Sequence, residues 1–538
     1  MQPDYPLVLT GGTVLDGSGG PGFRAHVAFY GGLIAQVDRA CRVRGEVEID
    51  CEGLVIAPGF IDTHSHSDLF ALASPSLEMK AMQGITLDVL GQDGISVAPA
   101  RDQDVVELKA QLAGLLGEPD VKWDWRSVAS YLDCLDDVKP AINLSYLVPH
   151  GSLRRFACGM EDRPANADEI ETMCTALEQG LKDGAVGLST GLIYPPCAYA
   201  PTEELIALCK VVARFNGVFV VHMRSESDRI VEAVHEMMRV GRESGVHVHI
   251  SHFKIAGGTN WTKIDRVLDV IAEARAGGVE VTADQYPYIA GSTMLGAILP
   301  PWAHAGGLDA VLARLASAEE RARMRAEMTD PREVEWDNFW KWGGPAAIRV
   351  ADIPSGRRQH LLGQNLEAAA AAEGKDPVDF AMDLLRDERM GVAMVSFSQC
   401  EPVIEKILKQ PYTCICTDGL LGGKPHPRAF GTFPRLLGRY VRERGVLTLE
   451  EAVYKSTYLA AKSFRLSGCG QIKKGHRANV CVFDANSVVD NATFEDPKQF
   501  STGIAHVFVE GRPIIAGGRP TGLFPGRTVR AMAPEDPW

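Results

Sequence analysis

Ile61-Asp62-Thr63-His64-Ser65-His66-Ser67-Asp68 is the stretch that decides the fold of this chain. It follows an apolar run, residues 53–60, that includes a Pro-Gly turn. Histidines two apart on an extended strand project to the same side, so His64 and His66 can present imidazole nitrogens to one metal ion. The pair alone is weak evidence, since an H-x-H pair is often incidental. Four further candidate ligands support it, each at the end of a strand-like apolar run.

The other candidate ligands are Asp93, His222, His252 and Asp418. Asp93 ends an apolar run between two glycines, and its two oxygens can bridge two ions; a plain turn aspartate is the alternative. The other three each follow a run of apolar or β-branched residues. Parallel β/α barrels place functional groups at the carboxyl ends of their strands. The pattern therefore predicts one metal site built from four histidines and two aspartates.

Neighbouring residues receive structural interpretations. His247 and His249 precede His252 by odd intervals, so on a regular strand we expect them to face the helices and to bind no metal. Cys414 and Cys416 share the strand parity of Asp418, but they are interpreted as small core residues.

Strand-like and helix-like segments alternate through the middle of the chain, which is typical of a parallel β/α architecture. Good helix patterns occupy, for example, residues 230–244 and 264–276. Eight strands are the number that a closed (β/α)8 barrel of the TIM type requires. The eight candidate strands are residues 59–62, 87–91, 141–148, 185–189, 218–221, 246–251, 279–283 and 412–417.

Both ends of the chain show short strands and glycine turns. We expect residues 1–57 and 470–538 to complete one small β-sandwich domain, and two separate edge sheets are the alternative. Residues 58–469 are the predicted catalytic barrel. The alternation fails between about residues 290 and 410, which we interpret as a lid-like insertion between the last two barrel strands. Whether the apolar run 391–397 is a further barrel strand is left open.

The composition narrows the function classes. A chain of 538 residues with 46% hydrophobic and 23% charged residues is typical of a soluble globular protein with more than one core. The net charge of −14 argues against nucleic acid or an anionic membrane as partner. No apolar run approaches the ~20 residues of a membrane span. Without a signal-peptide pattern, we expect a cytoplasmic location and twelve reduced cysteines.

At this point the sequence resembles the amidohydrolase superfamily and, within it, the D-aminoacylase (N-acyl-D-amino-acid deacylase) family. The resemblance covers nearly the whole chain. Its motifs are Ala57-Pro58-Gly59-Phe60-Ile61-Asp62-Thr63-His64-Ser65-His66, His150-Gly151-Ser152-Leu153-Arg154, Gly187-Leu188-Ser189-Thr190-Gly191-Leu192, His222-Met223-Arg224-Ser225-Glu226, Ser251-His252-Phe253-Lys254, Asp284-Gln285-Tyr286-Pro287-Tyr288 and Thr417-Asp418-Gly419.

The resemblance implies an α/β fold: a TIM-like, metal-dependent hydrolase barrel with a small β domain and a lid. It implies zinc at His222 and His252 with a bridging ligand, and a weaker second site at His64, His66 and Asp418. The family bridge is usually a cysteine in a Gly-Asn-Cys-Gly setting, whereas this chain has Asp93. A hard carboxylate lowers the preference for zinc, so manganese or cobalt are alternatives, with one or two ions.

The resemblance also implies a clamp for the α-carboxylate of a small N-acyl-D-amino acid or related amide, formed by Lys254, Tyr286, Ser292 and Arg428. Arginine can hold a carboxylate by two parallel hydrogen bonds; a surface ion pair is the alternative for Arg428. Arg224 and Glu226 are interpreted as partners of the residues around His222. Asp418 is predicted as the general base and then acid for metal-activated water.

Three alternatives remain at this stage. A cyclic-amide hydrolase of the hydantoinase or dihydroorotase type shares the barrel, but it requires a bridging lysine that residues 187–192 lack. An amidase for xenobiotic amides would keep every ligand and alter the lid. A non-catalytic scaffold should have lost ligands, whereas all six positions carry one. A homo-oligomer is compatible with the sequence.

Overall fold

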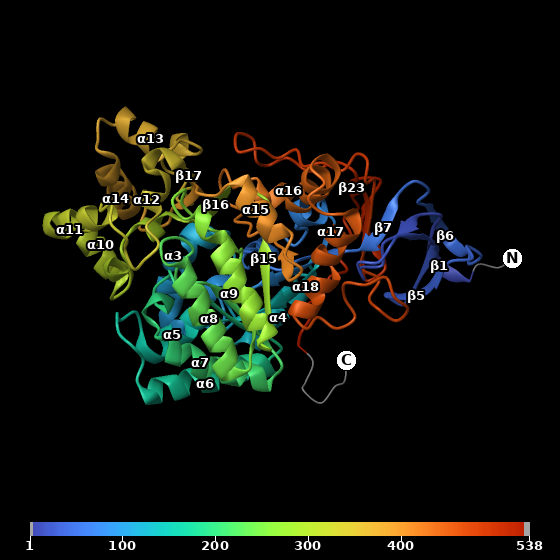
Figure 1. Cartoon of the computed structure of the whole chain (residues 1–538), viewed down its shortest axis with the longest axis horizontal. Helices are drawn as coiled ribbons and strands as arrows, with labels where there is room; N and C mark the ends of the chain where they lie inside the picture. Colours follow the sequence, from blue (N-terminus) through green and yellow to red (C-terminus); the bar gives the residue numbers. More distant parts are fainter. Residues whose placement is uncertain (1–3, 532–538) are drawn as a thin grey trace.

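Parallel strands separated by helices form the predicted barrel in the computed structural model, which describes residues 4–531 (Figure 1). One sheet pairs β8, β9 and β10, a second pairs β11 to β15 and then β19, and every pair is parallel. With β10 and β11 counted as one strand, these are the eight predicted strands. Their bounds are β8 (Phe60–Asp62), β9 (Ile85–Leu90), β10 (Asn143–Tyr146), β11 (Val148–Pro149), β12 (Gly187–Gly191), β13 (Val218–His222), β14 (His247–Ile250), β15 (Val281–Gln285) and β19 (Thr413–Ile415).

Backbone contacts at two places join these sheets into a closed barrel. Between β10 and β12, the Val186 amide donates to the Tyr146 carbonyl at 2.9 Å. On the other side, β8 and β19 meet just beyond their ends, where the Asp418 amide donates to the His64 carbonyl at 2.8 Å. The seam between the first and last strands is therefore built by two segments that carry predicted metal ligands.

Helices cover the barrel because their apolar residues recur with helical spacing. In α8, Ile230, Val234, Met237 and Gly241 are buried along one face, and the helix ends at Gly245 in a left-handed conformation. None of the helices in residues 4–531 is long and apolar enough to cross a membrane. The covering helices are α6 (Ala167–Lys182), α7 (Thr202–Arg214), α8 (Ile230–Ser244), α9 (Ile264–Ala276) and α15 (Glu401–Leu408).

The barrel interior corrects one prediction. β14 pairs with β13 so that His249 lies opposite Val220, which belongs to an interior cluster with Phe464. The His249 ring packs edge-on against Phe464, and both its nitrogens contact side chains of β15. The expectation that His247 and His249 face the helices is therefore wrong. The strand parity does not extend to His252, because the backbone there turns into the left-handed region at φ 35°.

Both chain ends share one β domain, as the sequence suggests. β7 (Val55–Pro58) pairs antiparallel with β20 (Val480–Phe483), and one hydrophobic cluster joins the two sheets of the domain. The first sheet contains β1 (Tyr5–Thr10), β4 (His26–Tyr30), β5 (Leu33–Asp38) and β6 (Gly45–Asp50); the second adds β2 (Thr13–Val14), β3 (Phe23–Arg24), β21 (Ile504–Val509), β22 (Arg512–Ala516) and β23 (Arg519–Pro520).

The predicted C-terminal segment 470–538 does not lie entirely in this domain. Beyond β23 the chain returns to the barrel, where the Gly526 amide donates to Pro140 and the Val529 amide donates to Leu144. The last described residues therefore line the barrel beside β10. Residues 532–538 lie outside the described residues.

The insertion forms a compact unit of its own. β16 (Ala290–Met294), β18 (Ala393–Phe397) and β17 (Ile348–Asp352) make an antiparallel sheet, so the run 391–397 is not a barrel strand. Figure 1 shows the insertion and the small β domain at opposite ends of the molecule. The insertion helices are α10 (Leu308–Ala316), α11 (Ala318–Met328), α12 (Phe339–Gly343), α13 (Leu366–Ala372) and α14 (Pro377–Asp387).

Candidate metal centre

The six predicted ligands come together at the carboxyl end of the barrel. Each lies at or just beyond the end of a strand: His64 and His66 after β8, Asp93 after β9, His222 at the end of β13, His252 after β14, and Asp418 after β19. All six side chains are buried. The spacing along the chain is large, but the parallel strands bring their ends to one place.

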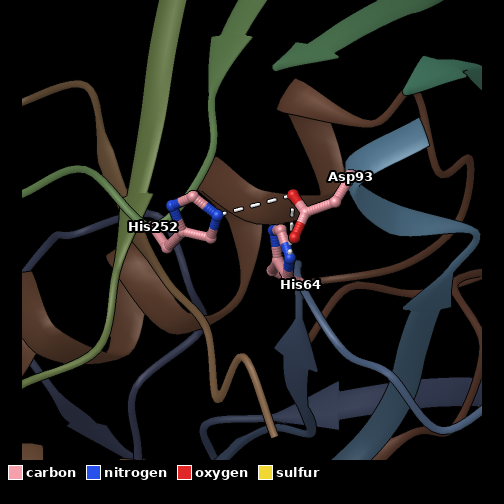
Figure 2. A group of neighbouring side chains, drawn as sticks. All are labelled: His64, Asp93 and His252. Atoms are coloured by element: carbon pink, nitrogen blue, oxygen red, sulfur yellow. Dashed lines mark ion pairs between the residues drawn. The ribbon is translucent and has the colours of Figure 1, made fainter. Parts of the chain in front are cut away.

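The Asp93 carboxylate faces several of the histidines, and Figure 2 shows it turned toward His64 and His252. Its Oδ1 is 3.4 Å from His252 Nε2 and 3.5 Å from His64 Nε2, and its Oδ2 is 3.5 Å from His66 Nε2. The two oxygens therefore face histidines that follow two different strands, β8 and β14. A carboxylate that bridges two ions needs such an arrangement.

Two sets of ligand atoms have the spacing of metal sites. In the first set, Asp93 Oδ1 lies 3.4 Å from His252 Nε2 and 3.5 Å from His64 Nε2; His222 approaches this set through its Nδ1, 3.0 Å from His252 Nε2. In the second set, Asp418 Oδ1 lies 3.3 Å from His66 Nε2 and 3.7 Å from His64 Nε2. Tetrahedral zinc with bonds of about 2.0–2.2 Å has ligand atoms about 3.3–3.6 Å apart, and the spacing in both sets is close to this range.

Buried atoms without partners support this fit. His64 Nε2, His222 Nε2 and Asp93 Oδ1 are buried, and none has a hydrogen-bond partner within residues 4–531. Buried polar groups are usually satisfied, because leaving one unpaired costs about 1–3 kcal/mol. A bound cation would satisfy Asp93 and His64 at once.

The backbone of the cluster is held in an uncommon conformation. Asp93, His252 and Asp418 have φ values of 55°, 35° and 47°, in the left-handed region that non-glycine residues rarely adopt. Such residues cost about 1–3 kcal/mol each and collect at functional sites. Gly91 allows the turn before Asp93, because a Cβ there would lie 2.3 Å from the Leu147 carbonyl oxygen.

The electrostatics favour a cation. Burial raises the pKa of the Asp418 carboxyl, but Arg428 and His64 outweigh it and hold that pKa well below its usual range. Burial opposes protonation of His66, yet hydrogen bonds with the two carboxylates of Asp418 and Asp93 raise its pKa to about 9. The carboxylates therefore attract positive charge strongly enough to keep a proton on His66. A bound metal ion would compete with that proton for the ring nitrogen.

Glu226 joins the cluster more closely than its sequence position suggested. Its Oε1 is 3.1 Å from His252 Nδ1, and its Oε2 is 3.7 Å from His222 Nε2. Both oxygens also accept hydrogen bonds from Lys254 Nζ, at 2.6 and 2.7 Å. A carboxylate behind a ligand histidine fixes the orientation of its ring. The resemblance to the family indicated Glu226 only as a partner of the residues around His222, and its direct approach to both histidines was not predicted.

Three of the four residues of the predicted carboxylate clamp lie beside the cluster. Lys254, Tyr286 and Ser292 line a pocket of about 420 Å³ together with Asp418 and other cluster residues. The fourth, Arg428, does not line this pocket: it is fully buried and forms an ion pair with Asp418, Nη1 to Oδ2 2.9 Å. The alternative of a surface ion pair for Arg428 is therefore excluded.

Residues of the insertion form part of the wall of this pocket. Phe339 and Trp342 line it, and Asp337 ties the insertion to the loop after β13. Asp337 accepts hydrogen bonds from Ser225 Oγ at 2.7 Å and from the Glu226 amide at 2.8 Å. The lid is thus bonded to the loop that carries Glu226.

A buried lysine, which the sequence gave no reason to select, supports both ligand-bearing segments. Lys80, in α2 (Glu78–Ala81), donates to Asp62 Oδ2 at 2.6 Å, Ser65 Oγ at 2.8 Å and Thr417 Oγ1 at 2.9 Å. Asp62 also accepts the Thr417 amide at 2.7 Å. The ammonium group therefore fixes the seam between β8 and β19, one residue away from Asp418.

Replacing Lys80 by methionine is expected to destabilise the fold by about 3–5 kcal/mol, because it leaves buried Asp62 uncompensated. Urea denaturation measures the change. The matched control is Lys182→Met, whose exposed ion pair with Glu178 should contribute far less, because solvent screens it. Equal losses in the two variants would show that the buried ammonium has no special structural role.

Comparison with known proteins decides the family. A model described as the amidohydrolase family matches residues 47–515. The chain belongs to the amidohydrolase family. This amidohydrolase is 36% identical over 533 residues to a D-aminoacylase of Alcaligenes xylosoxydans xylosoxydans, and the match covers 99% of each chain.

Solved structures give the same family and confirm the predicted fold class. The structure of a D-aminoacylase with a binuclear metal centre matches with a TM-score of 0.82 and 35% identity, over 98% of this chain and 100% of that one. An N-acyl-D-glutamate deacylase of Bordetella bronchiseptica, complexed with zinc and a phosphonate that mimics the tetrahedral intermediate, matches with a TM-score of 0.81 and 32% identity over the same shares. The role of each site residue in this amidohydrolase stays a prediction.

Proposed function

We propose that this amidohydrolase cleaves the amide bond of N-acyl-D-amino acids, releasing a carboxylate and a free D-amino acid. One observation carries the proposal: Asp418 connects the two halves of such a site. Its Oδ1 faces His66 at 3.3 Å, and its Oδ2 pairs with Arg428 at 2.9 Å. The metal-ligand cluster and the cation for a substrate carboxylate therefore share one side chain.

We assign the ion to zinc, held by His222, His252 and Asp93, with a second position at His64, His66 and Asp418. Two histidines and a carboxylate are a common zinc donor set, although the hard Asp93 oxygen also suits manganese or cobalt. A bound ion of this kind supplies Lewis acidity at the amide carbonyl and water that reacts at neutral pH. Because the two Asp93 oxygens face histidines of both positions, the site can hold either one ion or two.

Asp418 is the proton carrier in this proposal. It takes a proton from the attacking water, the remaining oxygen bonds to the amide carbon, and the carbon–nitrogen bond then breaks. The same proton passes from Asp418 to the leaving amine nitrogen, so no other acid is needed. Ionised Asp418 is the starting form, in keeping with a pKa that Arg428 and His64 depress against the effect of burial.

Arg428 can couple substrate binding to this proton transfer. In the free site its charge is directed at Asp418, which makes that carboxylate a weak base. A substrate carboxylate at Arg428 would offset the cation and raise the pKa of Asp418. Lys254 is already bonded to both oxygens of Glu226, so it serves the substrate as a shared cation. The base would thus gain strength only when a substrate carrying a carboxylate is bound.

The proposal is tested by measuring amine release from N-acetyl-D- and N-acetyl-L-amino acids, and ring opening of dihydroorotate and hydantoin. Hydrolysis of the D series is expected, with the L series at least about 100-fold slower, because a fixed clamp misplaces the amide of the mirror image. Turnover of the cyclic amides alone would favour the hydantoinase-like alternative. That alternative requires a bridging lysine, and β12 contains no lysine. No activity on any D substrate would overturn the proposal.

A further inference from the structure

One side chain of strand β12, Ser189, bonds to both ends of the turn that carries Asp93. The Ser189 hydroxyl donates a hydrogen bond to the Gly91 carbonyl, and it accepts one from the Gly94 amide at 3.0 Å. Ser189 is fully buried, and its hydroxyl has a single proton to donate, which the Gly91 carbonyl accepts. The donor and an acceptor position of this side chain are therefore both used by the turn.

The end of β12 also packs directly against the backbone of this turn. A Cβ on Gly191 would lie 2.5 Å from the Asp93 carbonyl oxygen, and a Cβ on Gly94 would lie 2.9 Å from the Thr190 Cα. Glycine at both positions allows this close approach, because it has no side chain to separate the two backbones. The turn therefore lies on the strand end, where Ser189 is placed to bond to it.

The Asp93 carboxylate depends on its backbone for its position. Asp93 Oδ1 is buried and has no hydrogen-bond partner among the residues that the structure describes. The residue also has a φ of 55°, a left-handed conformation that persists where the surrounding structure holds it. The direction of the carboxylate therefore follows from the geometry of the turn.

The remaining bonds to the turn come mainly from the segment after β8. Asp68 Oδ1 and the Thr63 carbonyl, both in that segment, accept hydrogen bonds from the turn at 3.0 and 2.9 Å. At the far end of the turn, the Cys197 thiol approaches the Gly94 carbonyl only at 3.9 Å. Ser189 therefore supplies the stronger bond to the residue that follows the candidate ligand.

We propose that Ser189 is a positioning residue for the bridging ligand Asp93. The inference rests on the proposed metal assignment. Ser189→Ala leaves the Gly91 carbonyl and the Gly94 amide without this partner, so the turn should relax and the carboxylate should move away from the ion. Outer partners that orient a metal ligand typically contribute about 10–100-fold to metal affinity.

Zinc affinity tests the inference. The full chain is depleted of metal and titrated with zinc in competition with a chromophoric chelator, and Ser189→Ala should bind zinc about 10–100-fold more weakly than the wild type. Ser145→Ala is the matched control, because Ser145 is also fully buried on a barrel strand, β10, and its hydroxyl has no hydrogen-bond partner within residues 4–531. The control should keep the wild-type affinity. Equal affinities in Ser189→Ala and the control would overturn the inference.

A double variant separates positioning from a general loss of structure. If Ser189 acts through Asp93, adding Ser189→Ala to Asp93→Ala should change zinc affinity by less than about twofold, because the group that it positions is absent. The same loss in both backgrounds would show that the hydroxyl supports the fold and not the ligand, and the inference would fail. Unchanged affinity in Asp93→Ala alone would remove the bridging assignment and the inference with it.

Threonine and valine at position 189 decide the case in which the alanine variant does not fold. The two side chains have nearly the same shape, and threonine keeps the hydroxyl. Tighter zinc binding by Ser189→Thr than by Ser189→Val supports the inference, and equal binding overturns it. None of these measurements needs turnover, so they decide the role of Ser189 even if no N-acyl-D-amino acid is hydrolysed.

Discussion

Asp418→Asn is expected to lower kcat by about 10²–10⁴-fold, the usual contribution of a positioned general acid and base. That factor corresponds to about 3–5 kcal/mol of barrier. Asparagine has nearly the same shape, but it cannot take a proton from water or return one to the leaving amine. KM for the substrate should change much less than kcat, because the residue acts on the reacting atoms.

The matched control is Asp490→Asn, which also removes a carboxylate that pairs with an arginine, Arg435, at 3.1 Å. It does not belong to the ligand cluster, so kcat should stay near the wild-type value. Metal analysis of Asp418→Asn should still show the ion assigned to His222, His252 and Asp93. Near-normal turnover in Asp418→Asn would remove this residue from the proton-transfer role.

Asp93→Ala is expected to weaken metal binding by more than about 100-fold, since losing even an outer partner of a ligand costs about 10–100-fold. Asp93 faces His64, His66 and His252, so its removal weakens both predicted positions. Elemental analysis after gel filtration measures the bound metal, and activity should fall with it.

Asp93→Cys is the informative comparison. A thiolate keeps the negative charge but is a softer ligand, so the variant should hold zinc and lose relative affinity for manganese and cobalt. Unchanged metal content in Asp93→Ala would exclude the bridging assignment. An unchanged order of metal preference in Asp93→Cys would show that the hard carboxylate does not set the choice of ion.

The barrel and the position of the candidate ligands at its strand ends could be predicted because each depends on local order along the chain. An apolar run that ends in a histidine or aspartate identifies a strand end, and parallel strands bring such ends together. His222 and Asp418 follow this rule directly. His249 does not follow it. The parity argument assumed a regular strand up to His252, but β14 ends at Ile250 and His252 has a left-handed backbone conformation.

Features that depend on contacts between distant segments could not be predicted. Lys80 lies in a short helix and looks like any other lysine in the sequence, yet it bonds to a strand end 337 residues away at Thr417. The bond between Glu226 and Lys254 joins two different strand loops. Phe339 and Trp342 line the pocket beside the metal ligands only because the insertion packs against the barrel.

The most direct test of the metal centre is a titration of metal-depleted protein with zinc, followed by the rate of N-acetyl-D-amino acid hydrolysis at each addition. Activity is expected to be nearly absent at the start and to rise with the first equivalent of bound zinc, and Asp93→Ala should show no such rise at the same zinc concentrations. Full hydrolysis by the metal-depleted protein would contradict the claim that the four histidines and two aspartates hold a catalytic ion.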